Sequence, residues 1–388
     1  MKRDYLRSAI LDLILSRGDA TRPELVKTTG VRAASVFEAV DELKREGILC
    51  EPERSGRRTG RKAPCLRLNP EYFLCAGIDF QVRRTFGTVV DLSGEIRYRA
   101  ELPSLGRGSL MACRDEIRTV LRHLQGQAGS EWKRVRGIGF ADPGLVDVKK
   151  GLSIRAVNVP GWENARTGDW LSEENGLPAG VWTEGQVKTF MEYHLRGKEM
   201  NGSLFHLGMD DGIGGGFIKN GECFIGDTHQ AMEIGHIVID PSGPLCQCGN
   251  RGCLESLAGE AGIRRRIREA ISSGVDTVLK LENFSIPYFT ECAKFDKTAH
   301  IIASEVSDSI GRALAVAVVL LNPSVIVLCG ELTGLGDLLL ESIHRELNRR
   351  CFSGTVRELK LEFSRLDKYD TARGAAIMMR NQLLRSEF

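Results

Sequence analysis

The sequence predicts an α/β protein in which a small helical module precedes two related α/β lobes. The first seventy residues carry three short amphipathic helices and a strand pair, and buried strands alternate with helices after them. At about 150 residues per domain, a chain of 388 residues suffices for two or three domains. The hydrophobic share of 42% and the charged share of 27% exclude a largely disordered or fibrous protein.

Charge and cysteine content exclude further classes of protein. The net charge of +2 gives no sign that the whole chain binds nucleic acid, so only a local imbalance can indicate it. Eleven cysteines cannot all pair, and most lie singly among apolar neighbours as expected of reduced thiols, which favours a cytoplasmic protein. The longest apolar run, residues 313–321, is about half of a membrane span. Charged residues in the first turns interrupt any signal-peptide core.

Residues 1–70 predict a winged helix-turn-helix domain. Apolar positions recur at helical spacing, and Thr21-Arg22-Pro23-Glu24 fits a capping box that starts the second helix. A small helical dimerisation module has the same elements, so the charge pattern must decide between the two. We expect helices over residues 3–17, from Thr21 to Gly30 and from Arg32 to Gly47, and strands over residues 48–50 and 65–68.

The charge pattern of this module favours DNA binding. Residues 54–67 contain six basic side chains and no acid, whereas a solvated face normally mixes signs. Such a segment suits phosphate neutralisation, and the start of the third helix is placed to touch base edges or phosphates. The predicted DNA-binding residues are Arg32, Ser35, Arg54, Arg57, Arg58, Arg61 and Lys62.

Residues 71–388 predict a duplicated α/β fold with a cleft between its lobes. Hairpin strands are followed by a helix and another strand, and this order returns later in the chain. In the first lobe we expect strands over residues 74–80, 85–92, 95–102 and 135–140 and a helix around residues 109–127. In the second we expect strands over residues 203–209, 214–219, 222–225 and 325–329, a long helix ending near Leu321, and a last helix over residues 371–384.

One histidine and three cysteines lie close together in the sequence of the second lobe. His236, Cys246, Cys248 and Cys253 can fill the tetrahedral shell of zinc, and Gly249 and Gly252 permit the sharp turns that a compact knuckle needs. Four protein ligands leave no open position, so we expect a structural Zn²⁺ and not a catalytic one. The alternative is a set of reduced thiols that holds no metal.

These residues carry a resemblance to a known family. Glu233-Ile234-Gly235-His236, followed by Cys246-x-Cys248-Gly249-x-x-Gly252-Cys253-x-Glu255, resembles the signature of the ROK family, which groups sugar-responsive repressors with sugar kinases. Thr21-Arg22-Pro23-Glu24-Leu25 and Gly60-Arg61-Lys62-Ala63-Pro64 resemble its repressor branch. The resemblance covers almost the whole chain and implies an actin-like, ribonuclease-H-like ATPase fold behind the winged helix.

The resemblance also implies a sugar site. Asn158, Glu233, His236 and Glu255 match family residues that contact pyranose hydroxyls. Carboxylates suit this work because each oxygen accepts from a hydroxyl, and His236 would bind zinc through one nitrogen and a sugar oxygen through the other. The alternative for Glu233 and Glu255 is support of the zinc loop.

The chain departs from the family's kinases at two places. Gln186 stands where kinases have the aspartate base, with Gly185 in the neighbouring asparagine position, and an amide cannot take a proton from a hydroxyl. Residues 80–84 replace the kinases' Gly-Gly-Thr-Lys phosphate loop. The glycine run at residues 212–216 remains, and we interpret it as a hairpin turn. The sequence therefore predicts no enzyme activity.

Together these patterns predict a cytoplasmic, sugar-responsive transcriptional repressor with a structural zinc. Its expected partners are double-stranded operator DNA, a sugar or sugar-derivative effector, and a second copy in a homodimer or dimer of dimers. Two alternatives remain: an active sugar kinase with a DNA-binding appendage, and a regulator switched by a protein partner without a sugar.

Overall fold

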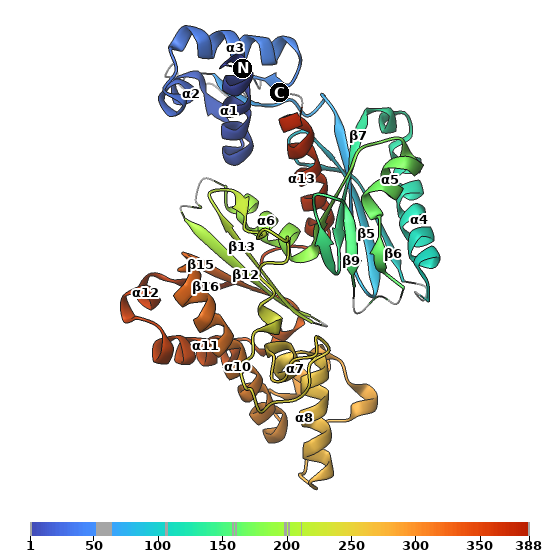
Figure 1. Ribbon diagram of the computed structural model, residues 1–388, viewed down its shortest axis with the longest axis vertical. Coiled ribbons are helices and arrows are strands. Elements are labelled where there is room, and N and C mark those ends of the chain that lie inside the picture. The colour runs from blue at the N-terminus through green and yellow to red at the C-terminus, as the bar shows by residue number, and fades with distance from the viewer. Residues whose placement is uncertain are drawn as a thin grey trace. The chain divides into compact units, whose positions relative to one another are not determined.

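The structure, a computed structural model, describes residues 2–51, 64–104, 108–156, 159, 161–197, 200, 202–210 and 212–386. It forms two compact units (Figure 1). The first unit comprises Met1–Glu199 and Leu366–Phe388, and the second comprises Met200–Arg365.

The N-terminal module has the expected three helices and strand pair. Its elements are α1 (Lys2–Arg17), β1 (Ala20–Thr21), α2 (Arg22–Thr29), α3 (Ala33–Arg45), β2 (Leu49–Cys50) and β3 (Cys65–Leu68). The predicted capping box is confirmed, because the Thr21 side chain accepts from the Glu24 amide and the Glu24 carboxylate accepts from the Thr21 amide. Strand β1 was not predicted; it pairs with β3 and makes the sheet three-stranded.

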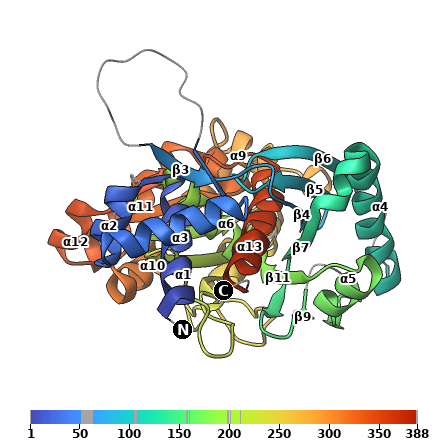
Figure 2. The ribbon, with the colours of Figure 1, turned by 90° about the horizontal axis from the view of Figure 1, so that it is seen from above.

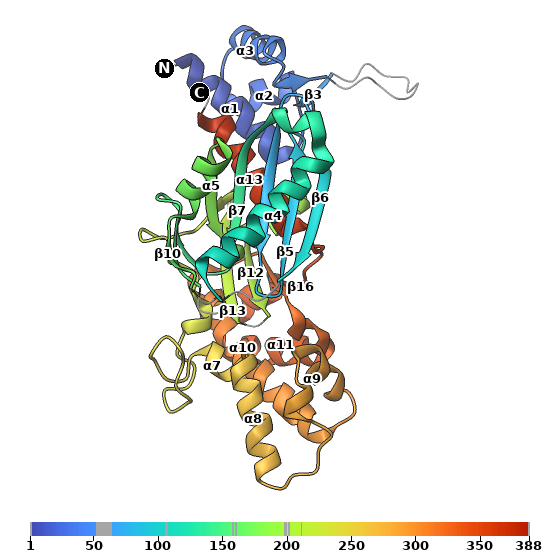
Figure 3. The same cartoon turned by 90° about the vertical axis from the view of Figure 1, so that its right-hand side faces the viewer.

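A five-stranded sheet forms the α/β part of the first unit, in the order β11-β7-β4-β5-β6. Helix α4 packs on β5 and β6, and α13 packs on β4 and β7 (Figure 3). Gly77 and Gly139 allow α13 this close approach, since a Cβ on either would lie 2.0 Å from a carbonyl oxygen of the helix.

The strands are β4 (Leu74–Phe80), β5 (Arg84–Asp91), β6 (Ile96–Pro103), β7 (Val135–Asp142) and β11 (Ala179–Thr183). The helices are α4 (Leu110–Ala128), α5 (Thr167–Asn175), α6 (Glu184–Arg196) and α13 (Asp370–Ser386), and β8 (Leu145–Asp147), β9 (Leu152–Arg155) and β10 (Glu163–Ala165) make a small second sheet.

The second unit repeats this sheet topology, in the order β16-β15-β12-β13-β14. In both sheets three consecutive antiparallel strands are extended by two parallel strands. The predicted duplication is therefore confirmed. The strands are β12 (Ser203–Met209), β13 (Ile213–Lys219), β14 (Glu222–Cys223), β15 (Val325–Cys329) and β16 (Lys360–Phe363). The helices are α7 (Leu254–Ala258), α8 (Glu260–Ser272), α9 (Ile286–Cys292), α10 (Lys297–Leu321), α11 (Asp337–Arg350) and α12 (Ser353–Glu358).

One hydrophobic cluster joins the N-terminal module to the sheet of the first unit. Ile10, Ile14 and Val40 belong to the same buried cluster as Ile377 and Leu384 of α13. Helix α1 contacts α13, as Figure 2 shows from above. The predicted domain boundary at residue 70 is therefore not visible as a break in packing, and it stays a prediction. None of the helices in the described part of the chain has the length and apolar character needed to cross a membrane.

Candidate functional site

The start of α3 presents the predicted DNA-contacting residues of the helical module. Arg32 occupies the N-cap position, and both Arg32 and Ser35 are exposed. Arg32 makes no side-chain capping hydrogen bond, and its carbonyl accepts from the Ser35 and Val36 amides. The first two amides of α3, those of Ala33 and Ala34, therefore keep their partial positive charge for an anion. Arg22 holds α2 against α3 through an ion pair with Asp41 at 2.5 Å, and this pairing lowers the pKa of Asp41.

The basic segment of the predicted wing lies mostly outside the described residues. Arg54, Arg57, Arg58, Arg61 and Lys62 fall in that stretch, so their predicted role is not tested by the structure. Arg67 is described, and its side chain is exposed on β3.

The structure brings the predicted metal ligands together. One ligand atom from each of His236, Cys246, Cys248 and Cys253 lies within 4.8 Å of the others. The Nδ1 of His236 is 3.7 Å from the Sγ of Cys246, and the Sγ atoms of Cys248 and Cys253 are 3.6 Å apart. A tetrahedral zinc with ordinary bond lengths separates such atoms by about 3.6 Å and about 3.8 Å respectively. The four residues thus fit a metal of this geometry.

Residues 237–253, the loop that carries the three cysteines, form what we call the knuckle loop. Its backbone packing explains why glycine is needed there. Gly252 has a φ of +66°, and a Cβ on it would lie 1.5 Å from the carbonyl oxygen of Asp240. The amide of Cys246 donates to Asn250 at 2.7 Å, and the amide of Leu254 donates to Ile237 at 3.0 Å. These bonds hold the cysteines beside His236, which ends the short 3-10 helix Ile234–His236.

Glu255 is positioned by the main chain of a neighbouring strand. Its Oε2 accepts a hydrogen bond at 3.0 Å from the amide of Ile213, the first residue of β13. Among the described residues the Glu255 carboxylate makes this one hydrogen bond, so its second oxygen can accept from a ligand. This bond leads to the β12–β13 hairpin, and the sugar contact of Glu255 and its alternative, support of the zinc loop, both stay predictions.

Glu233 and His236 complete the part of the predicted sugar site that lies in the second unit. The Glu233 side chain is exposed, and within the described chain its carboxylate has no hydrogen-bond partner. Partial loss of hydration raises the pKa of Glu233, while attraction to His236 lowers it and repulsion by Glu255 raises it. Because the Nδ1 of His236 faces the cysteines, its Nε2 is left for another acceptor or donor.

Asn158, the fourth predicted sugar contact, lies outside the described residues. The nearby loop is anchored by Trp162, whose fully buried indole donates to the Oδ2 of Asp142 at 2.9 Å. Burial raises the pKa of Asp142, and its hydrogen bonds from Ser153 and Trp162 lower it.

Gln186, which the family resemblance places at the position of the kinase base, is a helix-capping residue. Gln186 accepts from the amide of Thr183 at 3.2 Å, and the Gln186 amide donates to the Thr183 hydroxyl at 3.2 Å. This reciprocal pair is the capping box of α6, which was not predicted although the Thr183-x-x-Gln186 spacing is a sequence signal for it. Asp79 is buried and accepts from the side-chain amide of Gln81 at 2.6 Å.

The retained glycine run forms a hairpin turn, as interpreted. Met209 pairs with Ile213 and Gly208 with Gly214, so the chain reverses between these strands. The Oδ1 of Asp210 accepts from the amide of Glu331 at 3.0 Å, which ties the turn to the segment after β15.

Several known proteins are similar to this chain over most of its length. A protein-family model described as the ROK family matches residues 75–382. The putative xylose repressor of Caldicellulosiruptor sp. (strain Rt8B.4) is 26% identical over 97% of this chain and 95% of its own. The Escherichia coli K12 DNA-binding transcriptional dual regulator NagC is 25% identical over 97% and 92% of the two chains. A crystal structure of a ROK family transcriptional regulator, a homolog of the E. coli Mlc protein, has the same fold with a TM-score of 0.84 and 23% identity, over 99% of this chain and 97% of that one.

Proposed function

The chain belongs to the ROK family, and we propose that it is a DNA-binding transcriptional repressor of carbohydrate metabolism that responds to a sugar or sugar derivative. The observation that carries this proposal is that one chain combines a helical module exposing the start of α3 with the Glu233, His236 and Glu255 group. Relatives named as repressors match the chain over 97% of its length, the N-terminal module included.

The N-terminal module acts as a winged helix-turn-helix in this proposal. Helix α3 presents Arg32 and Ser35 toward the major groove, while Arg54, Arg57, Arg58, Arg61 and Lys62 neutralise phosphates. The open N-terminus of α3 favours a phosphate in the same place. These features support DNA binding over the alternative of a dimerisation module.

A structural Zn²⁺ held by His236, Cys246, Cys248 and Cys253 belongs to the proposal. The interatomic distances of the site and the soft donor set support zinc. With four ligands, the ion would contribute folding free energy and fix the orientation of the His236 ring.

The effector contacts in the second unit are Glu233, His236 and Glu255. Two carboxylate groups and an imidazole nitrogen offer several hydrogen-bond acceptors. A pyranose has hydroxyl groups on adjacent carbons, and these hydroxyls can donate to such acceptors. Asn158 would add an amide to these contacts.

Catalysis is not part of the proposed function. Gln186 has no useful proton affinity and is committed to the cap of α6. This observation speaks against the alternative of an active sugar kinase.

The proposal is tested by binding of the purified protein to a palindromic operator, with and without sugars. We propose that a homodimer binds two half-sites, so the affinity should depend on half-site spacing. A monosaccharide that changes operator affinity supports the proposal, and by linkage the DNA must change the sugar affinity by the same factor. A response to no sugar, amino sugar or sugar phosphate would favour the regulator that a protein partner switches.

A further inference from the structure

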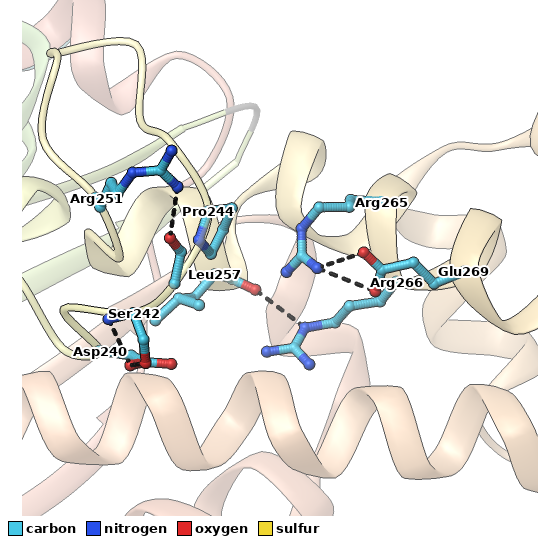
Figure 4. A pocket seen from close by; sticks show the side chains of 9 residues that line it. Asp240, Ser242, Pro244, Arg251, Leu257, Arg265, Arg266 and Glu269 are labelled. Atoms are coloured by element: carbon cyan, nitrogen blue, oxygen red, sulfur yellow. Dashed lines mark hydrogen bonds and ion pairs between the residues drawn. The ribbon is translucent and has the colours of Figure 1, made fainter.

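A pocket of about 470 Å³ lies where the knuckle loop meets α8, outside the residues assigned above. Asp240 and Arg251 line it from the loop, and Arg265, Arg266 and Glu269 line it from α8. Figure 4 shows Arg251 on one side of the pocket and the two arginines of α8 on the other.

The pocket has more cationic than anionic side chains. Arg265 donates to both carboxylate oxygens of Glu269, at 2.7 and 3.0 Å, and Arg266 pairs with Glu305. Arg251 has no carboxylate partner among the described residues. Within that part of the chain its guanidinium makes one long hydrogen bond, of 3.5 Å, to the main-chain carbonyl of Gly243. One guanidinium at this place is therefore not balanced by an acid.

A buried donor also lacks an acceptor here. The Nε of Arg265 is buried and has no hydrogen-bond partner within the described part of the chain. Buried N–H groups are nearly always paired in folded proteins, so an unpaired one marks a place for an acceptor that the protein itself does not supply.

We propose that this pocket binds the phosphoryl group of a small hydroxylated metabolite. Guanidinium groups bind oxyanions through paired N–H bonds, and guanidiniums on opposite sides suit a tetrahedral group with several oxygens better than a planar carboxylate, which one fork satisfies. Asp240 suits the rest of such a ligand. Its Oδ1 accepts from the Ser242 amide and hydroxyl at 3.0 and 2.7 Å, and its other oxygen can accept from a ligand hydroxyl.

Binding at this place would fasten the knuckle loop to α8. Arg251 lies between the proposed zinc ligands Cys248 and Cys253, so a phosphoryl group joining it to Arg265 restrains the segment that holds the metal. The inference does not rest on the proposed sugar site, because none of the pocket residues belongs to that site.

The test is calorimetric titration of the full-length protein at matched ionic strength with inorganic phosphate, glycerol 3-phosphate and glycerol. The variants are Arg251→Gln and Arg265→Gln, and the matched control is Arg268→Gln, an exposed arginine of α8 that does not line the pocket. We expect each phosphate compound to bind the control with the same affinity as the wild type. Each compound should bind each pocket variant at least tenfold more weakly. Glycerol 3-phosphate should bind more tightly than phosphate, and glycerol alone should not bind.

Absence of phosphate binding, or equal affinity in the control and both pocket variants, overturns the proposal. If inorganic phosphate binds more tightly than glycerol 3-phosphate, the proposal that the ligand is a phosphorylated metabolite is overturned. The pocket is then a site for free phosphate. Zinc content and circular dichroism establish that each variant is folded. If Arg251→Gln loses its metal, Arg265→Gln, which lies outside the knuckle, decides the result.

Discussion

The carboxylate of Glu255 accepts a hydrogen bond at 3.0 Å from the main-chain amide of Ile213, and this bond joins α7 to the start of β13. The bond leaves one carboxylate oxygen open and fixes its direction. A ligand that pulls on Glu255 therefore pulls on the β12–β13 hairpin as well, so the residue is both a proposed sugar contact and a link to the sheet.

Replacing Glu255 separates these two roles. Glu255→Ala should abolish the sugar response and lower the free energy of unfolding by about 1 kcal/mol, the usual contribution of one hydrogen bond. Glu255→Gln keeps an oxygen that can accept from Ile213, so it should retain stability while binding sugar more weakly. Urea unfolding and sugar titration measure the two effects. An unaltered sugar response in Glu255→Ala would count against the site.

Metal analysis of purified protein should find one zinc per chain. Cys248→Ser should lose most of it and weaken effector binding, because the loop before Glu255 would no longer be fixed, while the helical module stays folded. The control is Cys50→Ser, which makes the same chemical change in β2 at a cysteine outside the four-residue metal group, and it should keep its zinc. A zinc content near zero in the wild type, with full stability in chelator, would contradict the prediction.

Removing wing arginines should change the salt dependence of DNA binding. Each phosphate contact contributes about 0.9 to the slope of log affinity against log salt, so Arg57→Ala, Arg58→Ala and Arg61→Ala together should reduce it by about 2 to 3. Ser35→Ala, on α3, should lower specific affinity and leave the slope nearly unchanged. Fluorescence anisotropy over a salt series measures both, with Arg268→Ala, which removes one exposed arginine of α8, as the control. A triple variant with the wild-type slope would exclude the wing from the interface.

The features predicted correctly from the sequence are ones that local rules determine, although the Thr183–Gln186 capping box, which follows the same rule, was missed. The Thr21–Glu24 capping box, the buried strands β4, β12 and β15 and the His236 cluster follow from spacing and apolar pattern, and the structure has them at the expected residues. The hydrogen bond from Ile213 to Glu255 spans 42 positions and uses a main-chain donor, so no pattern of side chains in the sequence predicts it. Likewise, the pocket at Arg251 and Arg265 depends on how the knuckle loop folds onto α8. Such contacts arise from tertiary packing, which residue spacing does not record.

The stability of the first unit should depend on pH through His194. This side chain stacks on Phe190 in α6 with ring centroids 5.6 Å apart, and burial, with repulsion from Arg380 and Arg373, lowers its pKa to about 4. In the unfolded chain its pKa is about 6.5, so between these values the unfolded state binds more protons than the folded state. Stability must therefore fall as the pH drops through this window, and the loss levels off below pH 4.

The comparison with His194→Gln isolates this contribution, because other titrating groups act on both proteins. Relative to the variant, the wild type should lose about 1 to 2 kcal/mol of unfolding free energy between pH 7 and pH 5. Urea unfolding at several pH values measures the difference. Parallel pH profiles would show that His194 is protonated equally in the folded and unfolded states.

The protein should transfer no phosphoryl group from ATP to any sugar. Gln186 lacks proton affinity, and loss of a general base typically costs a factor of 10² to 10⁴, or about 3 to 5 kcal/mol of barrier. Its side chain also accepts from the Thr183 amide, so it is held against the helix end. Residues 80–84 replace the glycines of the phosphate loop with larger side chains, which removes the close backbone approach that phosphate binding needs. Gln186→Asp alone should therefore restore no activity, and Gln186→Glu, which keeps the capping length, serves as its matched control. A coupled ATPase assay over a sugar panel is the measurement, and turnover within a hundredfold of an ordinary rate of about 10 s⁻¹ would contradict the prediction.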